Sequence, residues 1–171
     1  MTVVAYIGLG ANLQDPVAQV ENALAELGAL GHSRLLARSR LYLSAPVGYD
    51  GQPDFVNAVA ALETGLAPRA LLEDLFRIEQ QHGRERHFKN APRTLDLDLL
   101  LYGAARFHEP GLTLPHPRMH GRAFVLRPLA DIAPGLSLPG LGALGALLDG
   151  VAEQAARPLE HAVPSVVGGR P

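Results

Sequence analysis

Hydrophobic and polar residues alternate with two different periodicities along this chain, one typical of strands and the other of helices. Apolar runs, unbroken or alternating with polar residues, are typical of buried and half-buried strands and occupy residues 3–9, 35–43, 55–62 and 95–99. Apolar residues three or four positions apart predict the buried face of a helix, and they lie at Val17, Val20, Leu24 and Leu27 and at Leu71, Leu72, Leu75 and Ile78. The chain therefore predicts an α+β fold.

Residues at the ends of these segments agree with the predicted elements. Asp15 suits the N-cap position, Pro16 suits the first helical position, and Gly28 ends the first helical stripe. Pro68 opens the second helix, and the loop at residues 45–53 is rich in glycine and proline. The order strand–helix–strand, then strand–helix–strand, is that of a ferredoxin-like βαββαβ core, with an antiparallel sheet and helices on one side.

The remaining residues predict added C-terminal elements. Residues 122–129 and 141–148 are expected to form short helices, and the tail from about residue 151 is expected to be weakly ordered. There is no internal repeat and no second segment long enough for another core. We therefore expect residues 1–171 to form a single domain.

Composition excludes several classes of protein. A formal net charge of −2 argues against general nucleic-acid binding, which needs a broad basic surface. The absence of cysteine excludes disulfides and thiolate chemistry. No apolar run approaches the ~18 residues of a membrane span, and no basic leader precedes the first strand. We expect a cytoplasmic monomer with no nucleic-acid or membrane partner.

Two carboxylates stand out on the strand predicted at residues 95–99. Asp96 and Asp98 are two positions apart, so they project from the same face, while Leu95, Leu97 and Leu99 bury the other. Carboxylates this close repel each other unless a proton or a cation lies between them. Mg²⁺ is usually bound by one or two carboxylates together with phosphate and water. The pair therefore predicts a magnesium site, although acidic residues on the wet face of a strand are also common.

The segment just before this strand is rich in cations. Arg84, Arg86, Lys89 and Arg93 lie in a polar stretch that contains glycine and proline. Phosphoryl transfer needs this combination, because the metal bridges phosphate oxygens and the cations neutralise the remaining charge. Planar guanidinium groups can also grip phosphate oxygens with two hydrogen bonds.

The stretch Ala91-Pro-Arg-Thr-Leu-Asp-Leu-Asp98 resembles the signature of the 6-hydroxymethyl-7,8-dihydropterin pyrophosphokinase family, and the resemblance extends from about Val3 to about Pro134. It implies an enzyme of folate biosynthesis that transfers pyrophosphate from ATP to the hydroxymethyl group of 6-hydroxymethyl-7,8-dihydropterin and releases AMP. It also implies a ferredoxin-like catalytic domain and two Mg²⁺ ions held by Asp96 and Asp98. Further matching segments are Tyr6–Leu13, Gln52–Asn57, Arg77–Glu79 and Leu114–Pro117, followed by Arg122, Phe124 and Pro128.

The same resemblance implies roles for individual residues. Arg84 and Arg93 match the catalytic-loop arginines, which act with Asp96 and Asp98 and also contact ATP. Further residues implied at the ATP site are Glu79, Leu99, Thr113, His116 and Arg122. Those implied at the pterin site, where two aromatic rings enclose the pterin, are Ser44, Ala45, Val47, Phe55, Asn57, Asp96 and Phe124.

The chain departs from the family pattern at three positions. Ala91 stands where the family often has glycine, Asn90 where it has tryptophan, and Phe76 where it usually has glutamine. These changes leave open how the chain closes over ATP. Three alternatives also stay open: a paralogue that binds pterin or nucleotide without catalysis, a ferredoxin-like RNA-binding module, and a metal-dependent phosphohydrolase.

Overall fold

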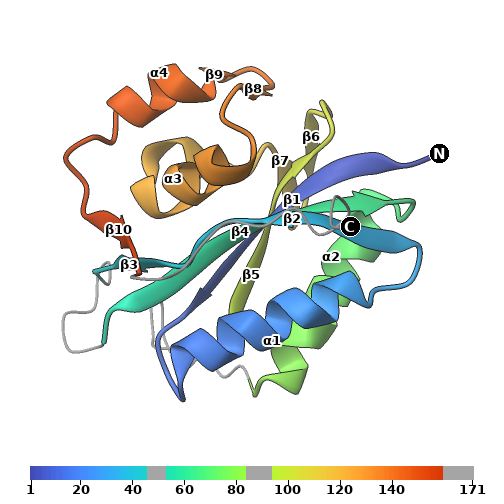
Figure 1. Ribbon diagram of the computed structural model, residues 1–171. Coiled ribbons are helices and arrows are strands. Elements are labelled where there is room, and N and C mark those ends of the chain that lie inside the picture. Colours follow the sequence, from blue (N-terminus) through green and yellow to red (C-terminus); the bar gives the residue numbers. More distant parts are fainter. Residues whose placement is uncertain (46–52, 84–93, 160–171) are drawn as a thin grey trace, which may run out of the picture.

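A six-stranded antiparallel sheet forms the centre of the computed structural model, which describes residues 1–45, 53–83 and 94–159 (Figure 1). Its strand order is β10-β3-β4-β1-β5, and β2 also pairs with β4. This order agrees with the ferredoxin-like α+β core that the sequence predicts, with β5 at one edge. The strands are β1 (Val3–Ala11), β2 (Ser33–Arg38), β3 (Tyr42–Ser44), β4 (Phe55–Thr64), β5 (Asp96–Tyr102) and β10 (Ala156–Pro158).

Helices cover both faces of this sheet (Figure 1). The core helices α1 (Pro16–Gly28) and α2 (Pro68–Gln81) lie on one face, as the sequence predicts. The added helix α3 (Ala123–Ile132) lies on the opposite face and packs on β4, with α4 (Leu144–Asp149) beyond it. The smaller elements are the hairpins β6 (Phe107–Glu109)–β7 (Leu112–Leu114) and β8 (Ser137–Leu138)–β9 (Gly142–Ala143), and the 3-10 turn η1 (Met119–Gly121).

The first helix begins and ends as its sequence predicts, but its buried face is narrower. The Asp15 carboxylate accepts a hydrogen bond from the Ala18 backbone N–H at 3.3 Å, which confirms the N-cap. Val20 and Leu24 are buried, whereas Val17 is 40% exposed and lies outside the core. The second helix buries all four residues of its predicted stripe.

The single strand predicted over residues 35–43 is wrong, because two strands occupy this region. The backbone N–H of Ser39 donates to the Val59 carbonyl, while the Ser39 hydroxyl accepts from the Val59 N–H at 2.9 Å and donates to the Arg40 carbonyl at 2.7 Å. The Arg40 N–H then donates to the Asp131 carboxylate. These side-chain bonds replace the regular ladder and separate β2 from β3.

The expectation of a weakly ordered tail from residue 151 is also wrong for residues 151–159. Val151 and Ala156 are buried, and β10 pairs with β3. The two predicted C-terminal helices exist with shifted bounds, since α3 extends to Ile132 and α4 begins only at Leu144, after the short β9. Residues 160–171 lie outside the described part of the chain.

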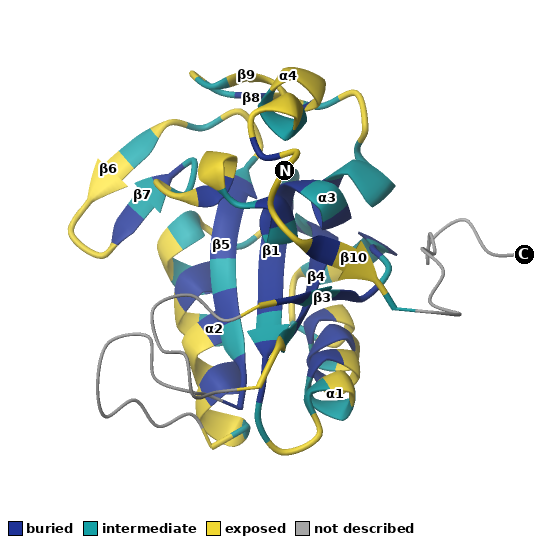
Figure 2. Ribbon diagram, turned by 90° about the vertical axis from the view of Figure 1, so that its left-hand side faces the viewer, coloured by how far each residue is buried: buried dark blue, intermediate teal, exposed yellow. Residues whose placement is uncertain are grey.

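Figure 2 shows the pattern of burial that results, with a buried sheet centre and exposed outer surfaces on α1 and α2. One core lies between the sheet and these two helices, and a second lies between the sheet and α3. Within the described ranges, no helix has the length and apolar character needed to cross a membrane.

Candidate functional site

Two cavities meet above the N-terminal half of β5. The sheet cavity, of about 500 Å³, lies over β1, β4 and β5 and is closed by α3. The edge cavity, of about 350 Å³, lies along the outer side of β5 between α2 and the segment that follows β7. Both are lined by Asp96, Asp98, Arg118 and Arg122. A ligand in one cavity would therefore meet a ligand in the other at two carboxylates and two guanidinium groups.

The two aspartates project where the sequence predicts them. Both are half-buried, while Leu97 and Leu99 between and beyond them are buried. On the neighbouring strand β1, Gly10 lies opposite Asp96 and Gly8 lies opposite Asp98. Because these partners lack side chains, no cross-strand side chain lies directly opposite the carboxylates, and both line the sheet cavity. A Cβ atom at Gly10 would lie 3.2 Å from Asn57 Oδ1.

The carboxylate of Glu79 holds this strand from α2. Glu79 is only 2% exposed, and its Oε2 accepts a hydrogen bond from the Leu97 N–H at 2.6 Å. Leu97 is the residue between the two aspartates, so Glu79 fixes the backbone that carries them. Glu79 is therefore a buried part of the site and not a charge on the solvent-facing surface of the helix.

The sheet cavity combines a polar edge with two aromatic side chains. Asn57 and Ser44 are both buried, and the Asn57 Nδ2 donates to the Ser44 hydroxyl at 2.7 Å. This bond leaves Asn57 Oδ1 on the side of Gly10, where it borders the cavity. Phe55 and Phe124 line the cavity from β4 and α3, and both are half-buried, with Phe124 also packed against the second core. Ala45 also lines this cavity.

The edge cavity gathers the residues that the resemblance implies for ATP. Leu99, Thr113 and His116 line it together with Glu79 and the shared Arg122. Phe76, which departs from the family pattern, also lines it and is 47% exposed. An exposed aromatic ring at this wall offers an apolar surface to a flat base.

His116 is held in one protonation state. Burial, followed by the positive charges of Arg122 and Arg118, lowers the pKa of His116 to about 4. The Arg118 backbone N–H donates to His116 Nδ1 at 3.2 Å, which assigns the proton of the neutral ring to Nε2. At neutral pH His116 is therefore an uncharged hydrogen-bond donor.

Three of the predicted site residues, Arg84, Arg93 and Val47, lie outside the described residues, as do Asn90 and Ala91. The residues that flank the segment 84–93 are joined, because the Thr94 hydroxyl donates to the His82 carbonyl at 2.6 Å. The described residues His82 and Thr94 therefore lie close together, just before the start of β5.

The sequence analysis missed two residues of the site. Arg118 borders both cavities, and its position directly after the Leu114–Pro117 motif was a usable signal. Gln154 borders the sheet cavity from the tail that was expected to be weakly ordered. No local pattern around Gln154 marks it as part of a site.

Comparison with known proteins gives one consistent result. The model of the 7,8-dihydro-6-hydroxymethylpterin-pyrophosphokinase (HPPK) family matches residues 6–134. Two curated relatives carry the name 2-amino-4-hydroxy-6-hydroxymethyldihydropteridine pyrophosphokinase. The Pseudomonas aeruginosa protein is 52% identical over 134 residues, covering 78% of this chain and 83% of the relative. The Haemophilus influenzae protein is 48% identical over 137 residues, covering 80% and 86%.

Solved structures agree on the fold. A crystal structure of HPPK-DHPS in complex with substrates superimposes with a TM-score of 0.67 at 14% identity and covers 87% of this chain. A Plasmodium falciparum HPPK-DHPS structure gives a TM-score of 0.70 at 15% identity, again over 87% of this chain. The present chain spans less than half of those two proteins, 43% and 45% of their lengths. The family match and the curated relatives together show that the chain belongs to the 7,8-dihydro-6-hydroxymethylpterin-pyrophosphokinase family.

Proposed function

We propose that this chain carries out its family's reaction where the two cavities meet. The reaction transfers pyrophosphate from ATP to the hydroxymethyl group of 6-hydroxymethyl-7,8-dihydropterin and releases AMP, as a step of folate biosynthesis. The observation that carries the proposal is that the sheet cavity and the edge cavity share Asp96, Asp98, Arg118 and Arg122. A two-substrate transfer needs such a junction, because the attacking oxygen and the phosphorus must be brought together in one orientation.

The sheet cavity suits the pterin. A flat ring would lie between Phe55 and Phe124, since aromatic side chains stack well on a planar heterocycle. The Asn57 Oδ1 would accept hydrogen bonds from the amino edge of the pterin. Backbone groups near Ser44, Ala45 and Val47 complete the proposed set.

The edge cavity suits ATP. The base would lie near Leu99, Thr113 and Phe76, and the phosphates would extend toward the shared arginines. The Nε2–H of neutral His116 would donate a hydrogen bond to a phosphate oxygen. Arg122 would add a bidentate guanidinium contact. Arg84 and Arg93 are proposed to supply further positive charge, on the basis of the family motif alone.

The residues present fit Mg²⁺. Asp96 and Asp98 offer two carboxylates beside open space, and among the described residues no group of three or more His, Asp or Glu side chains forms a fuller metal cage. Mg²⁺ usually takes only one or two carboxylates when substrate phosphates supply the other ligands. When bound by these two aspartates, Mg²⁺ would neutralise phosphate charge and lower the pKa of the pterin hydroxyl. Two ions are proposed, as the family resemblance implies.

The chemical step then follows from positioning. The hydroxymethyl oxygen attacks the β-phosphorus, the bond from that phosphorus to the α,β-bridging oxygen breaks, and AMP leaves with that oxygen. The hydroxyl proton is released to solvent. The protein's contribution is orientation by the two cavities and charge neutralisation by Arg118, Arg122 and the arginines of segment 84–93.

The decisive experiment measures AMP release from MgATP with and without 6-hydroxymethyl-7,8-dihydropterin. AMP that forms only when the pterin is present, with no ADP, is the expected result. ADP or phosphate would instead indicate a kinase or a phosphohydrolase, and no turnover would favour a binding-only paralogue. A ferredoxin-like RNA-binding module would bind RNA without Mg²⁺ and would ignore the pterin. We further propose a cytoplasmic monomer, and size-exclusion chromatography with light scattering tests the oligomeric state.

A further inference from the structure

The tail that follows α4 contributes to the sheet cavity, although it lies outside the region matched by the family model. That region ends at residue 134, whereas Gln154 lines the cavity together with Phe124 and Asn57. Gln154 is an exposed residue at the border of the cavity. Its contacts, rather than its burial, indicate what it does.

The side-chain amide of Gln154 brackets the backbone of Arg122. Its Oε1 accepts a hydrogen bond from the Ala123 N–H at 2.9 Å, and its Nε2 donates to the Gly121 carbonyl at 2.8 Å. These two peptide groups are the ones immediately before and after Arg122. One side chain therefore fixes both of the peptide planes between which the Arg122 side chain projects.

The Gln154 side chain also serves as the cap that the N-terminus of α3 otherwise lacks. Arg122 occupies the N-cap position of α3 with extended backbone angles, and its own side chain makes no capping hydrogen bond. The first N–H groups of a helix need acceptors from outside the helix, and here Gln154 satisfies that of Ala123 from a remote segment. The start of α3, and with it Phe124, is held by the tail.

The tail is itself firmly attached to both walls of the sheet cavity. The Arg127 guanidinium, on α3, donates to the Ala152 carbonyl at 3.1 Å and to the Ala156 carbonyl at 2.5 Å. On the other wall, Ala156 pairs with Ser44, whose hydroxyl accepts from Asn57. Gln154 is thus supported from both sides of the cavity.

From this geometry we propose that Gln154 is a positioning residue, which sets the Arg122 guanidinium for the nucleotide and the Phe124 ring for the pterin. The Arg122 guanidinium carbon lies 5.4 Å from the centre of the Phe124 ring, so a cation–π contact links the two side chains. The proposal rests on the function proposed above. If Gln154 has this role, the C-terminal tail forms part of the substrate-binding site.

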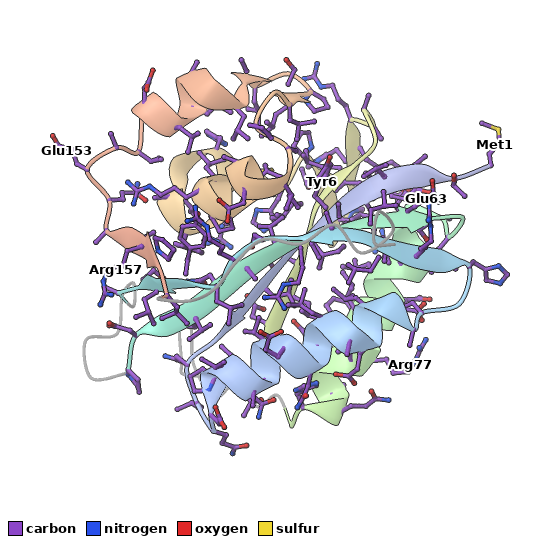
Figure 3. The ribbon with its side chains drawn as sticks, in the orientation of Figure 1. Met1, Tyr6, Glu63, Arg77, Glu153 and Arg157 are labelled. Carbon is purple, nitrogen blue, oxygen red and sulfur yellow. The ribbon has the colours of Figure 1, made fainter. Side chains whose placement is uncertain are left out.

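The test compares Gln154→Met, which keeps the size of the side chain and removes both hydrogen bonds, with the matched control Glu153→Met. Figure 3 shows Glu153 pointing away from the body of the protein. We expect Gln154→Met to raise the KM for MgATP and for the pterin about five- to tenfold, the order expected for two partly exposed hydrogen bonds. The KM values of Gln154→Glu should lie between those of the wild type and Gln154→Met, because the glutamate still accepts from the Ala123 N–H but cannot donate to the Gly121 carbonyl. The control should match the wild type.

A double-mutant cycle separates positioning from a general structural role. Affinity for MgATP is measured by calorimetry with an α,β-methylene analogue in Gln154→Met, Arg122→Ala and the double variant. If Gln154 acts through Arg122, its substitution has no further effect on nucleotide affinity once Arg122 is gone. Additive losses would overturn the proposal, as would a Gln154→Met enzyme with wild-type KM values. A wild-type protein without pterin-dependent AMP release would instead refute the proposed function.

Discussion

The two cavities share Asp96, Asp98, Arg118 and Arg122 but differ in the rest of their lining. The sheet cavity has a floor of glycine on β1, a buried amide at Asn57 and two aromatic rings. Beyond the shared residues, the edge cavity is lined by two ionisable side chains, Glu79 and His116, and by the exposed Phe76 ring. To the shared charges, the sheet cavity adds shape and neutral hydrogen-bonding groups, and the edge cavity adds ionisable groups.

This difference fits the proposed assignment of the pterin to the sheet cavity and of ATP to the edge cavity. A neutral heterocycle gains most from stacking and from a close fit, because it carries no charge to attract. A triphosphate gains most from cations and hydrogen-bond donors in a site that partly excludes water. Variants of the shared residues, or of residues that position them, should therefore affect both substrates, whereas variants confined to the rest of one cavity should affect only one.

The largest effect is expected at the junction. Asp96→Ala or Asp98→Ala should reduce turnover about a thousandfold or more, because each removes a carboxylate of the proposed Mg²⁺ site. Thermal unfolding should show that the fold is retained, since both side chains are half-buried on the face away from α1 and α2. AMP release at saturating MgATP and pterin is the measurement. The exposed Asp149→Ala serves as control, and near-full activity in either variant would contradict the metal assignment.

The next effect should be confined to the sheet cavity. Gly10→Val would place a branched side chain against Asn57 Oδ1 and toward Phe55, whose nearest carbon lies 3.9 Å from the Cβ position. We expect the KM for the pterin to rise about thirtyfold, which corresponds to about 2 kcal/mol and is the middle of the range for overfilling a close-packed site, while nucleotide affinity stays within about twofold. Gly145→Ala is the control, because a Cβ atom there meets no neighbour, and both its KM values should match those of the wild type. An equal loss for both substrates would remove the distinction between the cavities.

A smaller effect is expected from the carboxylate that supports β5. Glu79→Leu leaves the Leu97 N–H without this acceptor, which should destabilise the protein by about 1–3 kcal/mol and reduce kcat about tenfold by loosening both aspartates. Glu79→Gln keeps an oxygen acceptor and should recover most of the loss in kcat. Urea unfolding together with AMP release checks both parts. Equal kcat values in the two variants would show that Glu79 does not act through the strand.

The sequence predicts those features of the fold and the site that depend on local patterns, and it misses those that depend on contacts between distant residues. Alternation at residues 95–99 placed both aspartates on one face, because strand periodicity is local and independent of the rest of the fold. Ser39 broke a predicted strand because its hydroxyl bonds to β4, which is a contact across twenty residues. Gln154 went unnoticed for the same reason, since its partners lie 31 and 33 residues away.

The electrostatics of the edge cavity could not be predicted from the sequence, because they depend on the three-dimensional structure. The motif at Leu114–Pro117 identified His116, but its protonation state depends on burial and on the nearby Arg122 and Arg118. Sequence spacing does not report such proximity. The roles of Arg84, Arg93 and Val47 stay predictions, because those residues lie outside the described ranges.

The smallest effect concerns pH and an ionisable side chain, His116, that lines the edge cavity but not the sheet cavity. The pKa of His116 is about 4 in the folded protein, below its ordinary value of 6.5, so the unfolded chain binds more protons between these values. Stability should therefore fall as pH drops from 6.5 toward 4, by about 1–2 kcal/mol for this partly exposed group, and be unaffected by it above 6.5. His116→Asn should lose that part of the pH dependence in urea unfolding of the metal-free protein at pH 7 and 4.5. The exposed His120→Asn should keep it, and an unchanged pH dependence in His116→Asn would refute the neutral-donor assignment.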